Sequence, residues 1–293
     1  MLLSLFYFFI FKIVISSNDI YKDSNIIISL TSYPARIKFV HTAIYSLLNQ
    51  NMKPYKIILW LAKPQFPNGN KDLSKNLLDL IDKGLTIEYY DSDIDIKSYH
   101  KLIPTLKKYP NNIIVTADDD IIYGKDWLEK LYKTYLKYPK DIAAHRITQF
   151  IYKKNAFDIN VGGKHYYKKP SFLNKVTGVG GVLYFPNCFY KDILNEELFM
   201  KLAPTNDDIW FWLQAVLKGT RIRVVENPNI NLKYVPNSQN VGLYKINDHG
   251  EILFWKDFNR MLNYYKQLKT ILIKDFKEMI NKNKVEEEKE STL

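Results

Sequence analysis

Short β-branched runs alternate with helical patterns along the first half of the chain, and this alternation constrains the fold more than any other feature. Strands are expected at 26–32, Lys56–Leu61, Thr86–Tyr90 and Asn112–Ala117. Helical patterns lie between them at 37–48, at Asp72–Asp82 and at Ser98–Lys108, where Pro104 interrupts. Strands that alternate with helices imply βαβ units and a parallel sheet. We therefore predict an α/β fold with a mostly parallel sheet flanked by helices.

The second half of the chain is less periodic. An amphipathic helix is expected at Lys125–Tyr138, followed by an irregular stretch at 145–180. Two strands are expected at Val182–Phe185 and Ile222–Val225. A helix at Asp208–Lys218, closed by Gly219, lies between these strands, and a long helical stretch follows at Phe254–Ile280. No linker is obvious. We expect one domain at 25–250, with a donor side at 25–140 and an acceptor side at 141–250. A C-terminal helical extension at 251–281 and a solvated, frayed polar tail at 282–293 should follow.

The composition limits the partners. The formal net charge is +11, which favours nucleic acid, anionic lipid or phosphorylated substrates. The lysines are scattered and no nucleic-acid motif stands out, so we predict no nucleic-acid partner and favour a phosphate-rich small substrate or a membrane surface. Cys188 is the only cysteine, which excludes a disulfide framework and a cysteine-based zinc site.

The N-terminal segment 1–24 is unusually apolar. Met1–Ile15 is interrupted only by Lys12 and falls short of the about 20 residues that cross a bilayer. It also lacks the basic start and the cleavage site of a signal peptide. A short membrane-dipping anchor, an extra hydrophobic helix and a true span all stay open. We expect a cytoplasmic protein able to associate peripherally with the inner face of the plasma membrane.

Three consecutive aspartates, Asp118, Asp119 and Asp120, follow the predicted strand Asn112–Ala117. Adjacent carboxylates repel one another and are poor strand formers, so a chain needs a compensating cation to place them there. Mg²⁺ or Mn²⁺ would serve, sharing oxygen ligands with substrate phosphates. Ligands of parallel sheets bind at the carboxyl ends of the strands, where these aspartates should lie. The alternative is a solvent-exposed acidic turn.

A second acidic group, Asp207 and Asp208, follows Asn206 and precedes an aromatic helix. Acids at this position stabilise a helix N-terminus. The same placement could aim a carboxylate into a cleft as a general base. Trp210 and Trp212 could stack on a sugar, although aromatic residues in such a helix are more often core.

Glycines and basic residues complete the set of candidates. Thr177–Gly181 is not a dinucleotide fingerprint, so its glycines either let the backbone approach a ligand or form a tight turn. Arg36, Lys97 and Lys101 follow strand ends and could meet a diphosphate. For each of them a solvated surface role is the alternative.

Several motifs together resemble a known family. In chain order they are SLTSYPARI, SYHKLIP, IIVTADDD, TGVGG and LFMKLAPTNDDIWFW. This order is similar to the glycosyltransferases of bacterial capsule, exopolysaccharide and lipopolysaccharide gene clusters, distant relatives of family 2, and it covers about residues 25–250. The resemblance implies a GT-A fold, which is Rossmann-like, with a DXD-type motif and a nucleotide-sugar donor.

The resemblance also implies roles for individual residues. Asp120 would bind the metal, Asp118 and Asp119 would lie near the ribose and sugar, and Asp208, paired with Asp207, would be the general base. Thr31, Tyr33 and Arg36 match the loop that lies under the donor nucleotide, and Asp95 or Asp93 would be a further donor contact. Lys97 and Lys101 are donor contacts by their position after strand ends rather than by the resemblance. Asp95 or Asp93 would replace the base-binding acid that many relatives carry after the second strand, where this chain has Ala62 and Lys63. His249 could be a further metal ligand, and Gly180, Gly181 and Trp210 would contact the acceptor.

The implied activity is metal-dependent, inverting transfer of a sugar from a UDP- or GDP-sugar to a saccharide or lipid-linked acceptor in surface polysaccharide synthesis. One alternative is a nucleotidyltransferase that makes nucleotide sugars. Such an enzyme normally carries a glycine-rich basic loop after the first strand, and SLTSYPAR does not have one. The other alternative is a non-catalytic nucleotide-sugar-binding protein.

Overall fold

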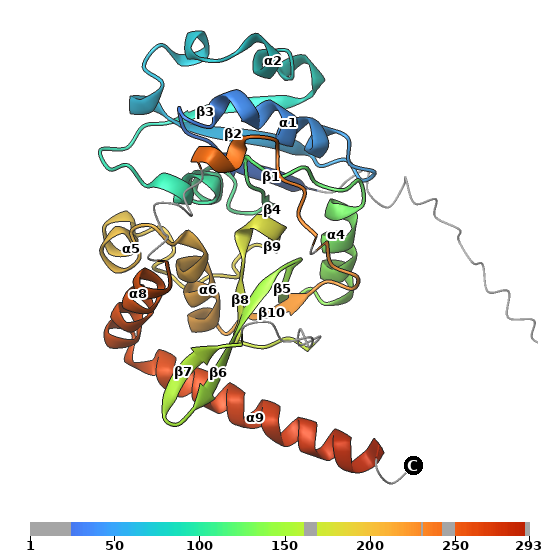
Figure 1. Cartoon of the computed structure of the whole chain (residues 1–293), viewed down its shortest axis with the longest axis vertical. Helices are drawn as coiled ribbons and strands as arrows, with labels where there is room; N and C mark the ends of the chain where they lie inside the picture. Colours follow the sequence, from blue (N-terminus) through green and yellow to red (C-terminus); the bar gives the residue numbers. More distant parts are fainter. Residues whose placement is uncertain (1–24, 161–168, 230, 242–249, 291–293) are drawn as a thin grey trace, which may run out of the picture.

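The computed structural model describes residues 25–160, 169–229, 231–241 and 250–290, which form a mixed α/β fold (Figure 1). Its main sheet has seven strands in the order β10-β5-β9-β4-β1-β2-β3. Their bounds are Ile26–Thr31 (β1), Lys56–Ala62 (β2), Leu85–Tyr90 (β3), Ile113–Thr116 (β4), Asp141–Ala144 (β5), Val182–Tyr184 (β9) and Arg221–Val224 (β10). Every pairing is parallel except the two that β9 makes with β4 and β5. The predicted α/β class with a mostly parallel sheet is confirmed.

All six strands expected from the sequence form, and each end differs from the expected bound by at most one residue. Strand β5 was not expected. Its four residues are too few for an alternating pattern to stand out. It matters for the fold because it pairs with both β9 and β10 and so extends the sheet beyond β9.

Helices bury both faces of the sheet. Helices α1 (Ile37–Leu48) and α4 (Trp127–Lys137) share one core with Val115, Ala143 and Leu183, whereas α6 (Asp207–Lys218) and α5 (Glu196–Leu202) share the other with Ile114, Ile142 and Tyr184. Neighbouring residues of β4, β5 and β9 therefore point into opposite cores, as the two-residue period of a strand requires. This explains why the strands are continuous apolar runs rather than alternating ones.

A second, three-stranded sheet lies outside the main one in the order β7-β6-β8, formed by Ala156–Ile159, Ile147–Lys153 and Asn174–Val176. The expectation of an irregular 145–180 stretch was therefore wrong in part. Polar residues at buried positions of these strands, such as Gln149 and Asn174, hide the alternation. The pairing of β6 with β8 ends at Ile147 and Val176, shortly before the glycine-containing turn η5 (Gly178–Gly180).

The C-terminal extension is two helices, α8 (Gly250–Tyr264) and α9 (Lys266–Glu290), rather than one. The break near Tyr265 allows Phe258 of α8 and Leu268 of α9 to enter the same core. Figure 1 shows α9 running beside β6 and β7 and away from the main sheet. The expected frayed tail is wrong as far as Glu290, because Lys- and Glu-rich sequence readily continues a helix.

Two shorter predictions also change. The helix expected over Asp72–Asp82 is instead a series of single turns, of which α2 covers only Lys75–Leu78. These turns bury Leu73, Leu77 and Leu80, so a continuous helix is not needed to bury the apolar side chains of this segment. Ser98–Lys108 is split into η4 (Lys97–Lys101) and α3 (Ile103–Lys108), with Pro104 in the first turn of α3 where its missing N–H is harmless. Gly219 closes α6 in the left-handed conformation, as predicted.

Within the described residues, no helix combines the length and the apolar character that crossing a membrane requires. The apolar segment 1–24 lies outside the described residues, so the membrane anchor stays a prediction.

Candidate active site

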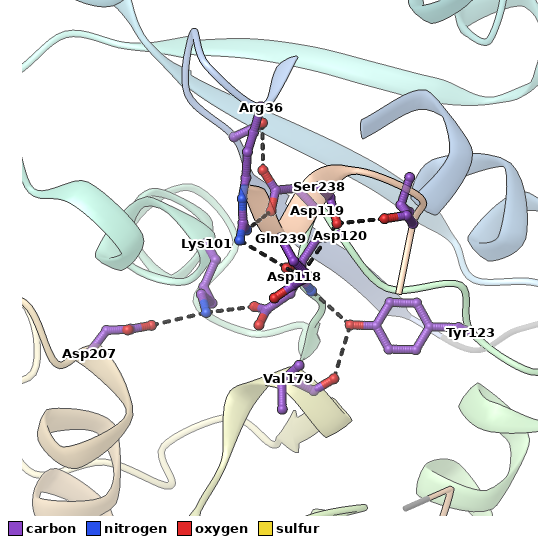
Figure 2. A network of polar contacts seen from close by, with 12 residues as sticks. Arg36, Lys101, Asp118, Asp119, Asp120, Tyr123, Val179, Asp207, Ser238 and Gln239 are labelled. Atoms are coloured by element: carbon purple, nitrogen blue, oxygen red, sulfur yellow. Dashed lines mark hydrogen bonds and ion pairs between the residues drawn. The ribbon is translucent and has the colours of Figure 1, made fainter. Parts of the chain in front are cut away.

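The candidate residues converge where β1 and β4 end at the same edge of the sheet (Figure 2). Arg36 follows β1 and the three aspartates follow β4. Between β3 and α3, η4 brings Lys101 to the same place, and the first turn of α6 brings Asp207 and Asp208. The parallel pairing of β1 with β4 explains why Arg36 and Asp119, which are 83 positions apart in the chain, meet here.

Two adjoining cavities open at this edge. The smaller, of about 320 Å³, is lined by Thr31, Ser32, Tyr33, Arg36, Ala62, Gln65, Asp95, Lys97, Ser98, His100, Lys101, Asp118 and Asp119. The larger, of about 680 Å³, is lined by Arg36, Ser98, Lys101, Asp118, Asp120, Thr177, Val179, Thr205, Asn206, Asp207, Asp208, Tyr234 and Gln239. Arg36, Ser98, Lys101 and Asp118 belong to both linings. We call the smaller the donor cavity, after the role predicted for its lining residues, and the larger the acid-pair cavity.

Each of the three aspartates has a different set of partners. Asp119 accepts hydrogen bonds from Arg36 Nη1 and Ser32 Oγ, both at 2.6 Å. Asp120 forms an ion pair with Arg36 Nη2 at 2.9 Å and accepts a bond from Gln239 Nε2 at 2.7 Å. Asp119 and Asp120 are each only 5% exposed, so the alternative of a solvent-exposed acidic turn is wrong. Buried cationic partners offset the repulsion that the sequence implied.

Burial shifts the pKa values of this cluster. It raises the pKa of Asp119 to about 6, against the lowering effects of Arg36 and Ser32. Burial and the neighbouring Asp118 charge also raise the pKa of Asp120. Burial opposes the charge on Arg36, but the facing Asp119 and Asp120 carboxylates hold the pKa of the guanidinium above its usual range. Arg36 therefore stays charged and ties the two carboxylates together.

Lys101 connects the aspartate cluster to the acid pair. Its ammonium lies 2.7 Å from Asp118 Oδ1 and 3.2 Å from Asp207 Oδ2, as Figure 2 shows. Asp207 Oδ1 also accepts a hydrogen bond from Ser98 Oγ at 2.8 Å. Burial disfavours the charge on Lys101, but Asp118 and Asp207 raise the pKa of the ammonium well above its usual value. One buried cation thus holds carboxylates from both acidic motifs.

Asp208 differs from Asp207 in its contacts. Asn206 caps α6 by accepting a bond from the Ile209 N–H at 3.3 Å, which confirms the helix-capping interpretation. Asp208 borders the acid-pair cavity, and its Oδ2 accepts a bond from the Gly178 N–H at 2.8 Å. Burial and the Asp207 charge raise the pKa of Asp208 to about 6, against the lowering effect of Lys101. Capping and exposure to a cleft therefore occur together.

The predicted donor contacts Thr31, Tyr33, Asp95 and Lys97 all line the donor cavity with Arg36 and Lys101. The Lys97 N–H donates to Asp95 Oδ1 at 3.0 Å, and Lys97 has a left-handed backbone with φ 51°. Such a conformation is uncommon for a residue with a side chain and is often found near functional sites. The structure places these residues together, and their donor-binding role stays a prediction.

Trp210 does not fit its predicted role. It is fully buried, and its indole N–H donates to the Ile193 carbonyl at 3.2 Å. Trp212 is equally buried and donates to the Phe172 carbonyl at 2.8 Å. Neither ring has a free face for a sugar, so the prediction that Trp210 contacts the acceptor is wrong. Both rings pack in the core that α6 and α8 share.

Gly180 and Gly181 also lie apart from the two cavities. The Gly180 carbonyl accepts a bond from the Trp127 indole at 2.7 Å, and a Cβ on Gly181 would lie 2.3 Å from the Trp127 ring. Close packing accounts for both glycines, on Arg146 for Gly180 and on Trp127 for Gly181. The linings of the two cavities give no support to their predicted contact with an acceptor. His249 lies outside the described residues.

Among the described residues, four that donate hydrogen bonds to the aspartates of the site were not expected from the sequence: Ser32, Ser98, Gly178 and Gln239. Ser32 belongs to the SLTSYP motif and Gly178 to TGVGG, so a motif marked the segment without marking the residue. Gln239 carried no signal. It reaches Asp120 because the segment after β10 crosses back over the aspartates, where the Val235 N–H donates to the Asp120 carbonyl at 2.7 Å.

The carboxylates of Asp118 and Asp120 have the oxygen-donor chemistry that a divalent cation sharing its shell with phosphates would need. Among the residues that the structure describes, no three His, Cys, Asp or Glu side chains form a complete metal cluster. Mg²⁺ commonly takes only one or two carboxylates in addition to substrate phosphates and water. Asp118 and Asp120 border the same cavity. The linked network holds four carboxylates against Arg36 and Lys101, an excess of two negative charges when all are ionised.

The chain matches no protein-family model and no curated protein sequence. Many solved structures show low-level likeness to it, and three of them illustrate its range. S. aureus TarS in complex with UDP is 12% identical, with 81% of this chain and 65% of that chain covered and a TM-score of 0.46. The mannosyltransferase PcManGT from Pyrobaculum calidifontis, in complex with GDP-Man and Mn²⁺, is 12% identical over 82% and 64%, with a TM-score of 0.46. A 4-diphosphocytidyl-2C-methyl-D-erythritol synthase from Anaerococcus prevotii is 14% identical over 76% and 99%, with a TM-score of 0.47. The chain spans a little under two thirds of the first two.

Proposed function

We propose that this protein is a GT-A-type glycosyltransferase that moves a sugar from a UDP- or GDP-sugar to a hydroxyl of a saccharide or lipid-linked acceptor, with inversion at the anomeric carbon. By the family resemblance, the acceptor would belong to surface polysaccharide synthesis. The apolar segment 1–24 and the basic charge would bring the enzyme to the cytoplasmic face of the membrane. Deleting Met1–Ser17 and fractionating cells tests that location, and an unchanged membrane fraction would contradict it.

One observation carries the proposal: Arg36 and Lys101 stand in the wall shared by the donor cavity and the acid-pair cavity. A sugar diphosphate that reached from one cavity into the other would meet both cations. Arg36 Nε is one of four buried side-chain polar atoms without a hydrogen bond in the described part of the chain. Buried polar groups are normally hydrogen-bonded, so this N–H is a candidate contact for a phosphate oxygen, and Arg36 lines both cavities.

The proposed chemistry assigns the proton to Asp208. Its carboxylate takes the proton of the acceptor hydroxyl while the oxygen bonds to the anomeric carbon. The bond from that carbon to the phosphate oxygen breaks, and the nucleoside diphosphate leaves with the electron pair. Arg36 and Lys101 balance the charge that develops on the diphosphate. Attack from the face opposite the leaving group gives inversion.

A divalent metal would be held by Asp120, with Asp118 as the second carboxylate on the same cavity. When bound, Mn²⁺ or Mg²⁺ would neutralise the diphosphate. The residues of the chain would position the donor in either case, because the donor cavity adjoins the aspartates through Arg36 and Asp118.

Slow donor hydrolysis tests the function without knowledge of the acceptor. The protein is incubated with a panel of UDP- and GDP-sugars and Mn²⁺, and release of the nucleoside diphosphate is measured. We expect release with at least one donor, and Asp120→Ala should abolish both this release and metal-dependent binding of the nucleoside diphosphate while circular dichroism shows an intact fold. An active Asp120→Ala protein would contradict the assigned site.

The same preparation tests the alternatives. A nucleotidyltransferase would release pyrophosphate from a nucleoside triphosphate and a sugar 1-phosphate. A non-catalytic protein would bind UDP or GDP in calorimetry and release nothing from the sugars. Once an acceptor is found, NMR of the product shows the anomeric configuration, and retention would exclude the role given to Asp208.

A further inference from the structure

Gly178 touches Asp208 in two ways. Its N–H donates to Asp208 Oδ2 at 2.8 Å. A Cβ built on Gly178 would lie 2.5 Å from Asp208 Oδ1, closer than real Cβ contacts allow. The carboxylate therefore occupies the space that any side chain at position 178 would need, and the backbone of the same residue holds it there.

The backbone of Gly178 does not itself require glycine. The described glycines with positive φ are Gly69, Gly84, Gly181 and Gly219, and Gly178 is not among them. Its neighbours have other reasons for lacking a side chain, because Gly180 is crowded by Arg146 and Gly181 by Trp127. For Gly178 the three nearest atoms to the missing Cβ all belong to Asp208. The need for glycine here is thus specific to that carboxylate.

We propose that Gly178 is the positioning residue of Asp208, with its N–H fixing one carboxylate oxygen and its missing side chain leaving room for the other. The inference rests on the proposed function, since it concerns the group assigned as the general base. The glycines of the TGVGG motif then have two roles: Gly178 positions Asp208 of the acid pair, whereas Gly180 and Gly181 allow the turn to pack closely.

The charges around Asp208 show what the N–H contributes. Three charged groups shift the pKa of its carboxylate: Asp207 on α6, Lys101 on η4 and Lys175 on β8. The Asp208 charge in turn raises the pKa of the phenols of Tyr99 and Tyr184. Asp207 and burial favour the protonated acid, whereas Lys101, Lys175 and the Gly178 N–H favour the carboxylate. A lengthened N–H contact would leave the pKa of Asp208 higher. The acidic limb of the pH profile would then move to higher pH.

Gly178→Ala tests the inference in the full-length protein. We expect kcat for donor turnover to fall about tenfold to hundredfold, because small displacements of a catalytic group have effects of that size. KM for the donor should change little, and the acidic limb of kcat/KM should move upward. Gly180→Ala is the matched control: its Cβ would lie 2.9 Å from Arg146, so it crowds the same turn without touching Asp208. It should leave the acidic limb in place.

A stability cycle provides a readout that needs no activity. Urea unfolding is measured for Gly178→Ala, Asp208→Ala and the double variant. If the added methyl clashes only with the carboxylate, Gly178→Ala should lower stability in the wild-type background and have little effect once Asp208 is alanine. Equal losses in both backgrounds would overturn the inference, and so would an unshifted acidic limb in an active Gly178→Ala protein. An active Asp208→Asn protein would instead overturn the proposed function and leave the contact itself intact.

Discussion

The two acidic motifs meet at the same edge of the sheet, yet their surroundings differ. Asp119 and Asp120 are enclosed by Arg36, Ser32 and Gln239. Asp208 borders the same cavity of about 680 Å³ as Asp120, but its bond comes from a backbone N–H. Carboxylates held by several side-chain donors are suited to bind and orient, whereas a carboxylate with one fixed oxygen beside a cavity is suited to accept a proton.

Removal of the proton-accepting group should have the largest effect on rate. Asp208→Asn keeps the size and the contact with Gly178 but cannot take a proton. We expect kcat to fall by about 10²- to 10⁴-fold, the usual contribution of a general base. Calorimetric binding of the nucleoside diphosphate should be unchanged, which separates this variant from Asp120→Ala. If Asp208→Asn also lost nucleotide binding, the two acidic motifs would not have separate functions.

Removal of the enclosing cation should have the largest effect on stability. Arg36→Met leaves Asp119 and Asp120 buried without their ion pair, and breaking such a pair costs about 3–5 kcal/mol. Urea unfolding measures the loss. Lys75→Ala is the matched control, since its pair with Asp79 is exposed and exposed pairs contribute about 0–1 kcal/mol. Similar losses for both variants would show that the aspartate cluster is not buried in solution.

The sequence predicted the elements of the site better than its contacts. Periodicity and β-branched runs located β1, β2, β3 and β4, and the carboxyl-end rule then located the aspartates. The sequence did not predict which carboxylate faces which cation. Those contacts depend on the path of η4 and on the segment that carries Gln239 over Asp120. Such contacts are non-local and leave no local pattern.

Aromatic and glycine residues show the same limit. Trp210 precedes Phe211 and Trp212 in the first turns of α6, and all three are buried because α6 is covered by the sheet on one side and by α5 and α8 on the other. A helix buried on all sides has no polar face to reveal which ring is free. For the glycines of TGVGG the sequence left open a close approach to a ligand or a tight turn, and it did not separate the three. In the structure each has a different neighbour: Asp208 for Gly178, Arg146 for Gly180 and Trp127 for Gly181.

The pH dependence should distinguish the two motifs on a smaller scale. A general base acts only when deprotonated, and the pKa of Asp208 is raised to about 6. We therefore expect kcat/KM to be constant above that pH and to fall about tenfold per unit below it, as a rate profile at constant ionic strength would record. Nucleotide binding measured over the same range should not follow this limb if Asp208 has no part in it.

The smallest effects come from the two serines that hold the acids. Ser32→Ala removes a bond to the buried Asp119, and bonds to charged groups contribute about 1.5–3 kcal/mol. Ser98→Ala removes the corresponding bond to Asp207, but Ser98 is half-buried whereas Ser32 is buried, so water can replace the Ser98 hydroxyl more readily. Urea unfolding should show a smaller loss for Ser98→Ala than for Ser32→Ala. The reverse order would mean that the acid pair, not the aspartate cluster, is the more enclosed of the two.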